Sequence, residues 1–540
     1  MKVAIVSPPW LHPTCPALGP ACLSAFLKRH APTAKIKVFD LNMAYYQQAL
    51  KALQKGSFGL KLYGWNENKT FQMVRAAFDY LKEKRLSQVD PSRWHEQATI
   101  FLSFENIFNG FMAEMASRDL LGLEIPQAVC HFFQRLLDDV VDFAPDICAI
   151  SIFFDAQMPF ALKVAKSIKQ RTDSFVVAGG ARFGTCPEPE RLFKKGVTIK
   201  AKGHEERLRD LWFIDGLIPA EGEIPLLELL KNLPSMALEN VPGMIFKRAN
   251  KVITNPCPPP LLPELIPTPD FSGLDLSSYM TPSVVLPYLT SRGCAWGKCT
   301  FCTHHRIYRA YRNISIERVV KQIKGLKRSY GARHFSFFDE MIPPSRLKSL
   351  SKELNRENLA IRFSFYAKPT SSFDHNLCKG LFDTGARCVL FGVESGSQKI
   401  LDLMNKGTTV ETMEQVLRNS SKAGLKNLAF IMFGFPGETK EDFLETIRFL
   451  ERNKKDIHAL SKGLFMLLEG SQIQREPERF FIKRMRPAWE NWACAITYDF
   501  ETETGLTRHK VKKLYKKHLP FLERIGISPR LGVYREHLLF

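Results

Sequence analysis

The stretch that decides the fold is Thr290-Ser291-Arg292-Gly293-Cys294-Ala295-Trp296-Gly297-Lys298-Cys299-Thr300-Phe301-Cys302. It places three thiols within one short loop, and its two glycines let the backbone curl so that the sulfurs converge. Thiolates are soft ligands that select zinc, copper(I) or iron–sulfur clusters. The stretch therefore predicts a metal centre.

Two kinds of centre are compatible with these thiols. A structural zinc site is closed by four ligands, and His304 or His305 would supply the fourth. An iron–sulfur cluster held by three cysteines leaves one iron open for a substrate or cofactor. The loop directly follows a strand predicted at Val285–Thr290, and parallel barrels carry their chemistry at strand ends. This position favours the cluster.

Strand and helix patterns alternate through residues 284–470 and predict a partial (β/α)6 barrel of the TIM type. The predicted strands are Val285–Thr290, His334–Phe338, Arg362–Ala367, Cys388–Val393, Leu428–Phe433 and Gly463–Leu468. Residues 471–540 lose this rhythm and are expected to form a small α-rich region.

A second strand–helix alternation predicts a doubly wound, Rossmann-like α/β domain over residues 1–250. Its predicted strands are Val3–Ser7, Ile36–Phe39, Ile147–Phe154 and Ser174–Ala178. A helical insertion is expected at about 43–140. Residues 251–283 are rich in proline and indicate a stiff linker between the two domains.

The cysteine loop resembles the cluster loop of the radical S-adenosylmethionine (SAM) superfamily. In that family three cysteines hold a [4Fe–4S] cluster whose fourth iron binds the methionine moiety of SAM. The resemblance implies that Cys294, Cys299 and Cys302 are the cluster ligands. This sequence has four residues between the first two cysteines, where three is commonest, a departure that recurs among cobalamin-dependent members.

The resemblance extends over roughly residues 284–455 and implies contacts with SAM at successive strand ends. Phe301 corresponds to an aromatic residue near the adenine, and Lys368 is either a partner of the methionine carboxylate or a solvated lysine. The full set of implied SAM-binding residues is Phe301, Asp339, Glu340, Lys368, Glu394, Ser395, Gly434 and Glu438.

A doubly wound domain in front of such a barrel resembles a cobalamin-binding arrangement. The implied contacts are Pro8, Ser151, Phe153, Phe154, Gln157, Gly179, Gly180, Glu221 and Gly222. The glycine pair would let a bulky ligand approach the backbone. No Asp-x-His-x-x-Gly loop is present, which resembles the subgroup whose cobalt has no protein histidine on its lower face. The alternative is a flavodoxin-like domain without a ligand.

Together these resemblances imply a cobalamin-dependent radical SAM methyltransferase acting on an unactivated carbon or phosphorus of a natural product, peptide or lipid. An electron donor such as flavodoxin or ferredoxin is the expected partner. The alternatives are a radical SAM cyclase or rearrangement enzyme, a methylthiotransferase acting on RNA or protein, and a zinc-stapled binding protein. Methylthiotransferases usually carry a second cysteine trio near the N-terminus, and Cys15 and Cys22 do not make one.

Composition limits the partners and the compartment. The formal charge of +21 over 540 residues favours acidic partners, but no compact basic run with interleaved aromatics occurs, so nucleic acid is possible and not favoured. No apolar run approaches the roughly 18 residues of a membrane span. The apolar start Met1–Val6 is too short for a secretory signal, and we expect a cytoplasmic protein.

Overall fold

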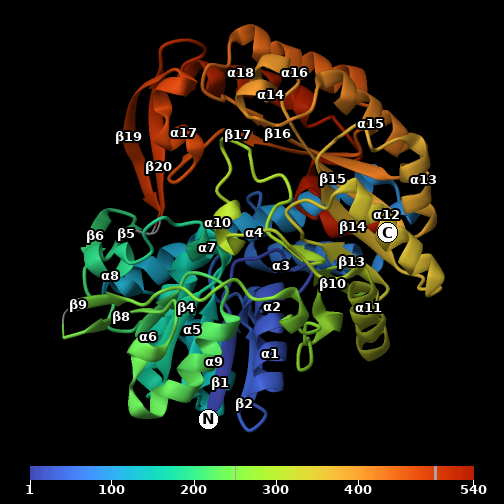
Figure 1. Ribbon diagram of the computed structural model, residues 1–540. Helices are drawn as coiled ribbons and strands as arrows, with labels where there is room; N and C mark the ends of the chain where they lie inside the picture. The colour runs from blue at the N-terminus through green and yellow to red at the C-terminus, as the bar shows by residue number, and fades with distance from the viewer. Residues whose placement is uncertain (250, 492–494) are drawn as a thin grey trace.

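The computed structural model describes residues 1–249, 251–491 and 495–540, which form two lobes, each built around a mainly parallel sheet (Figure 1). In the first lobe the strand order is β2-β1-β3-β4-β7-β8-β9. The strands are β1 (Lys2–Ser7), β2 (Lys35–Asp40), β3 (Ile147–Ser151), β4 (Phe175–Gly179), β7 (Gly216–Ile218), β8 (Ile245–Arg248) and β9 (Lys251–Thr254). The strand order reverses between β1 and β3, which confirms the predicted doubly wound arrangement.

Helices cover both faces of this sheet, as the near-continuous apolar runs of its strands require. Val3 and Ile5 face α1 (Leu18–His30) and α9 (Glu223–Asn232), whereas Ala4 and Val6 face the other helices. These others are α6 (Met158–Arg171) and the predicted helical insertion, which consists of α2 (Leu41–Gln54), α3 (Glu67–Glu83), α4 (Pro91–Leu120) and α5 (Gln127–Phe143). Short elements α7 (Ala181–Gly184), α8 (Arg191–Lys195), β5 (Val197–Ala201) and β6 (His204–Leu208) complete the lobe.

The second lobe contains six parallel strands that pair in sequence order, as predicted for a partial barrel. They are β10 (Val285–Tyr288), β13 (His334–Phe337), β14 (Arg362–Ala367), β15 (Ala386–Glu394), β16 (Lys426–Phe433) and β17 (Ala459–Leu464). Among the described residues no pairing of β17 with β10 closes the barrel. The outer helices are α11 (Ile316–Tyr330), α12 (Pro344–Arg356), α13 (His375–Asp383), α14 (Gln398–Leu403), α15 (Val410–Lys422) and α16 (Lys440–Asn453).

Two sequence-based expectations for the end of the chain were wrong. The last barrel strand begins at Ala459, four residues before the prediction, because Ala459 pairs with Leu428; β18 (Leu467–Leu468) joins another sheet. The region expected to be α-rich contains α17 (Gln472–Arg475) and α18 (Arg508–Leu522), but also the ribbon of β19 (Ile482–Asn491) and β20 (Ala495–Thr502). Pro487 argues against a strand, yet β19 lies at a sheet edge, where proline is tolerated.

Residues 527–540, which we call the C-terminal plug, fill the inside of the barrel. Leu531, Tyr534 and Leu538 are buried with the inward-facing Leu390 and Leu428. Phe540 packs on the ring of His334, the first residue of β13, with 4.3 Å between ring centroids. The plug thus closes the amino end of the barrel and leaves the carboxyl ends of its strands for a site.

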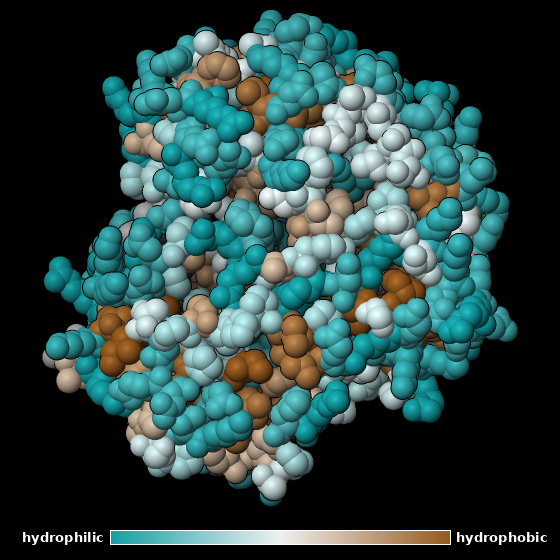
Figure 2. Space-filling model, in the orientation of Figure 1, coloured by the Kyte–Doolittle hydropathy of each residue, from teal (hydrophilic) through white to brown (hydrophobic). Residues whose placement is uncertain are grey.

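The face drawn in Figure 2 is mostly hydrophilic and is hollowed where the lobes meet. No helix in the described part of the chain is long and apolar enough to cross a membrane.

The glycine pair at the end of β4 serves the sheet itself. A Cβ on Gly179 would lie 2.8 Å from the carbonyl oxygen of Ile218, and one on Gly180 would collide with the backbone of Ile152. Gly180 also has a φ of 107°, which L side chains rarely adopt. The space that the sequence suggested for a ligand is occupied by neighbouring backbone.

We expect Gly180→Ala to lower the free energy of unfolding by about 2–3 kcal/mol, because the new Cβ meets backbone in a left-handed conformation. Thermal unfolding monitored by circular dichroism measures the change. Gly110→Ala is the matched control: no atom lies within 4 Å of its Cβ, and alanine favours helix α4. An unfolding midpoint for Gly180→Ala equal to that of the control would contradict the packing argument.

Candidate functional site

The cysteine loop is held at its base and along its side. Strands β11 (Ser291–Arg292) and β12 (Arg312–Asn313) pair at its two ends, and Gly293, with φ of 82°, lets the chain turn beside Ala310. Thr300 donates from its backbone N to Met404 O (3.1 Å) and from Oγ1 to Leu403 O (2.9 Å). The loop is therefore fixed against the end of α14 before any ligand binds.

Cys294, Cys299 and Cys302 are partly exposed in this loop, and their charges act on one another. Burial raises the pKa of Cys299, and raises that of Cys302 to about 12. Among the described residues, no three Cys, His, Asp or Glu side chains group closely enough to hold a single metal ion. A cluster binds each thiolate through a separate iron and needs a wider set of ligands, so the three thiols fit a cluster in kind and number.

Two acidic residues follow β13, and they have different roles. Asp339 is buried, and its carboxylate accepts hydrogen bonds from Thr290 N (2.9 Å), Thr290 Oγ1 (2.8 Å) and Ser291 Oγ (2.5 Å). It fastens the end of β10 to the end of β13. Glu340 is partly exposed and lies 2.8 Å from Nδ1 of His304, the residue considered as a zinc ligand.

Lys368 and Lys406 place two ammonium groups near the cysteine loop. The Nζ of Lys368 lies 3.2 Å from the ring centroid of Trp296, and it donates to Gly407 O (3.2 Å). Lys406 is buried and lies 2.8 Å from the Glu394 carboxylate. Its charge opposes the rise in the pKa of Cys299. The loop therefore has cationic neighbours, which favour bound thiolates.

The end of β15 is strained and tightly bonded. Glu394 has a φ of 68°, in the left-handed region that costs a non-glycine residue about 1–3 kcal/mol. Ser395 Oγ lies 3.1 Å from Thr446 Oγ1 and accepts from Ser397 N (3.1 Å). Glu394 and Ser395, both predicted to bind SAM, are thus held by the barrel itself, and backbone strain of this kind concentrates at functional sites.

At the end of β16, Glu438 is buried and accepts from Gly434 N at 2.6 Å. Its other oxygen, Oε1, has no hydrogen-bond partner in the described part of the chain. Burial raises the pKa of Glu438 to about 8. Phe301 packs nearby, against the cluster that contains Phe435.

In the first lobe, Gln157 ties the loops after β1 and β3 together. It donates from Nε2 to Pro8 O (2.7 Å) and accepts from Phe153 N (2.8 Å) and Phe154 N (3.2 Å). Phe153 and Phe154 are 55% and 53% exposed. Ser151, the last residue of β3, has its Oγ beside Gly19. A rigid loop thus presents two apolar rings at the switch point, where open α/β sheets bind ligands.

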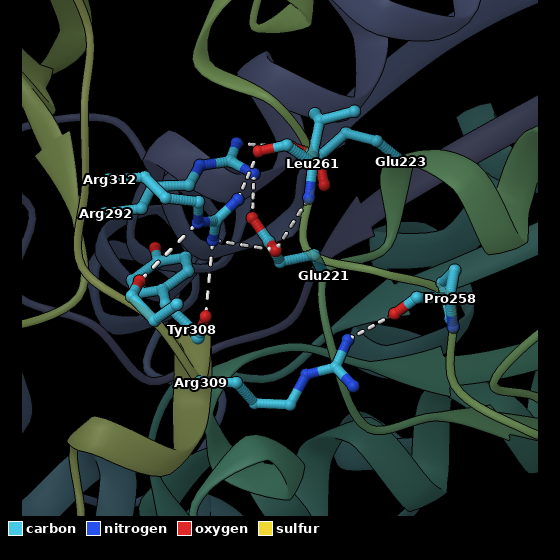
Figure 3. Close-up of polar contacts among 9 residues, drawn as sticks. Glu221, Glu223, Pro258, Leu261, Arg292, Tyr308, Arg309 and Arg312 are labelled. Atoms are coloured by element: carbon cyan, nitrogen blue, oxygen red, sulfur yellow. Dashed lines mark hydrogen bonds and ion pairs between the residues drawn. The ribbon is translucent and has the colours of Figure 1, made fainter.

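The two lobes meet through a buried charge network at the cysteine loop (Figure 3). Arg292 is 4% exposed, and its terminal nitrogens pair with Glu221 and Glu223, which lie at the start of α9. Arg312 Nη2 lies 2.9 Å from Glu221 Oε2. The Glu221 carboxylate, predicted as a cobalamin contact, is thus bonded to two arginines. Periodicity and spacing do not reveal such pairs.

A second contact brings the same surfaces together. A Cβ on Gly184 in α7 would lie 3.2 Å from the Cα of Ile307 in α10 (His305–Tyr308), the helix that follows Cys302. A Cβ on Gly222 would lie 3.1 Å from Leu23, so this predicted cobalamin contact also packs against protein. The carboxyl edge of the first sheet therefore packs against the loop that carries the cysteines.

Comparison with known proteins agrees with this arrangement. Residues 288–450 match the family model of the Radical SAM superfamily. This region is a radical SAM domain. The match confirms the family assignment made from the sequence and covers the six-stranded lobe from the end of β10 to α16.

Two solved structures of radical S-adenosylmethionine enzymes share the fold of most of this chain. The structure of OxsB with aqua-cobalamin bound aligns with 96% of this chain, and the alignment covers 67% of the OxsB chain. The TM-score is 0.61 and the sequence identity is 17%. The radical SAM methyltransferase TsrM of Kitasatospora setae aligns with 86% of this chain and covers 73% of the TsrM chain. The TM-score is 0.56 and the sequence identity is 17%.

Curated relatives are named for several activities. An uncharacterized methyltransferase of Pyrococcus horikoshii is 28% identical over 331 residues, or 59% of this chain and 67% of the relative. Other relatives are named as cyclases and methylthiotransferases, and the chain spans under half the length of the cyclases.

We expect Arg292→Met to destabilise the chain by about 3–5 kcal/mol, because it leaves the buried Glu223 carboxylate without its arginine and Glu221 with Arg312 alone. Thermal unfolding at neutral pH measures the effect. Arg309→Met is the control, since Arg309 is exposed and, within the described ranges, its side chain donates only to the carbonyl oxygen of Pro258 at 2.6 Å. Equal loss in the two variants would contradict the proposed importance of the buried network.

The raised pKa of Glu438 predicts a pH-dependent stability. The unfolded state ionises near pH 4.5 and the folded state near 8, so stability falls as pH rises through this window. Glu438→Gln removes this dependence on pH. Above pH 8 its free energy of unfolding is expected to exceed that of wild type by on the order of 4 kcal/mol. Unfolding midpoints of both proteins across the window test this, and parallel pH curves would refute it.

Proposed function

We propose that this chain is a cobalamin-dependent radical SAM methyltransferase that acts on an unactivated carbon or phosphorus of a natural product, peptide or lipid. The observation that carries the proposal is the packing of the cysteine loop against the carboxyl edge of the Rossmann-like sheet through Arg292, Glu221 and Glu223. An enzyme that uses two cofactors in one reaction needs their sites held at a fixed separation.

In this proposal Cys294, Cys299 and Cys302 hold a [4Fe–4S] cluster. When bound, the cluster supplies the electron that cleaves SAM to methionine and a 5′-deoxyadenosyl radical. Glu340, at the end of β13, is the acid proposed to meet the amino group of SAM, because Asp339 is committed to Thr290 and Ser291. The lysine side chains beside the loop favour its thiolates, and the fixed loop orients the ligand.

The Rossmann-like lobe is the proposed cobalamin site, and bound cobalamin would supply the methyl group. The exposed rings of Phe153 and Phe154 offer apolar surface to a macrocycle, and Gln157 holds their loop in place. Two predicted contacts, Gly179 and Glu221, are occupied by protein neighbours, so we assign cobalamin contact to the loops that follow β1 and β3.

The state of the cysteines bears on the compartment of the protein. Each described cysteine is free of a disulfide, which fits a reducing compartment. We therefore propose the cytoplasm as its location, and a small electron carrier such as flavodoxin or ferredoxin as the source of electrons.

The test is anaerobic reconstitution with iron, sulfide, cobalamin, SAM and a chemical reductant. We expect wild type to bind iron and to form 5′-deoxyadenosine, and Cys299→Ala to lose iron and at least about 99% of the cleavage, since the cluster needs all three thiolates. Cys257→Ala is the control, because Cys257 is exposed and lies in the linker.

The products separate the alternatives. Methylated substrate with S-adenosylhomocysteine supports methyl transfer, whereas SAM cleavage without methylation points to a cyclase or rearrangement enzyme. Sulfur insertion points to a methylthiotransferase. Stoichiometric zinc with no iron after anaerobic purification would overturn the proposal in favour of a zinc-stapled binding protein.

A further inference from the structure

The C-terminal plug carries one charged residue toward the carboxyl end of the barrel. Phe338 directly follows β13, and Tyr366 is the next-to-last residue of β14. The guanidinium carbon of Arg535 lies 5.1 Å from the ring centroid of Phe338 and 5.4 Å from that of Tyr366. Phe540, by contrast, lies at the start of β13. Arg535 is thus the part of the plug nearest to the catalytic ends of these strands.

Two features fix the plane of this guanidinium. The rings of Phe338 and Tyr366 contact it, and aromatic rings bind such cations through their π faces. Glu536 Oε1 lies 3.4 Å from Nε, while Glu536 Oε2 accepts a hydrogen bond from Thr14 Oγ1 at 2.9 Å. The side chain is therefore preorganised by the two rings and by the carboxylate beside Nε.

The two terminal nitrogens of the guanidinium, Nη1 and Nη2, differ from Nε in their hydrogen bonding. In the described part of the chain neither terminal nitrogen of Arg535 has a hydrogen-bond acceptor, although 29% of its side chain is exposed. The terminal N–H groups of Arg535 are thus available to a ligand. A planar pair of free N–H donors matches the geometry of a carboxylate or phosphate.

A second donor stands close by. His12, in the loop after β1, has a ring that is 43% exposed, and its Nδ1 lies 3.2 Å from Glu105, which is fully buried. Glu105 also accepts from Tyr46 OH (2.8 Å) and from Tyr534, the residue before Arg535. The charges of His12 and Arg535 act on each other. A histidine and an arginine from different lobes are thus held near one another by buried glutamates.

We propose that Arg535 anchors an anionic group of the substrate, a carboxylate or a phosphate, at the floor of the barrel, with His12 as a nearby second donor. The inference rests on the proposed function, since it assumes that the substrate enters the carboxyl end of the barrel. The formal net charge of +21 would favour the approach of such a substrate.

Anion binding can be measured on the full chain without SAM or reductant. Inorganic phosphate and acetate are the probes, and titration calorimetry gives their affinities. We expect Arg535→Gln to weaken phosphate binding by at least about tenfold, since a bidentate, charge-assisted pair is lost. Arg524→Gln is the control, because it removes the same charge from an exposed position in the same region. Arg535→Lys keeps the charge without the fork and should bind with intermediate affinity.

Chemical footprinting of wild type covers the case in which Arg535→Gln does not fold. Phosphate should slow modification of Arg535 by phenylglyoxal, read by peptide mass spectrometry, and leave Arg524 unaffected. Tighter binding of phosphate than acetate, or the reverse, identifies the anion.

Equal affinity in Arg535→Gln and wild type, or no protection of Arg535, would overturn the proposal. Failure of the wild type to cleave SAM would instead refute the proposed function, while footprinting still decides the anion site.

Discussion

The buried pairing of Arg292 with Glu221 and Glu223 is the constraint on which the site depends. Charges leave water at a high cost, and a partly compensated set is worse than none, so the three side chains must be placed together. Arg292 stands two residues before Cys294, and both glutamates belong to the other lobe. The conformation of the cysteine loop is therefore set in part by a domain that contributes none of its thiols.

Several polar residues at the strand ends form hydrogen bonds with other segments of the same chain. Asp339 joins β10 to β13, Ser395 binds Thr446, and Gln157 joins two loops of the first lobe. A site whose supporting groups are already bonded needs little rearrangement when a ligand arrives. This leaves contact with ligands to groups that are only partly satisfied, such as Glu340, the rings of Phe153 and Phe154, and Arg535.

The sequence predicted most of the regular elements because their signals are local. The strand Arg362–Ala367 was predicted with the bounds that the structure shows, since the apolar pattern of a strand is set by a few neighbouring residues. Contacts between distant segments leave no such trace. The pairing of Glu221 with Arg292, the collision that requires Gly180, and the burial of Tyr534 inside the barrel all join segments far apart in the chain. The β19–β20 ribbon was missed for another reason, because its basic residues and Pro487 disguise an edge strand.

The position of the C-terminal plug also has a consequence for biosynthesis. As translation proceeds, all six barrel strands leave the ribosome before the segment that fills their bore, so Leu390 and Leu428 stay without their partners until residues 531–538 emerge. Contacts of such long sequence separation form late and expose apolar surface in the meantime. The interior of the barrel is therefore complete only once residues 531–538 have packed into it, and a chain truncated before the plug would leave Leu390 and Leu428 without these partners.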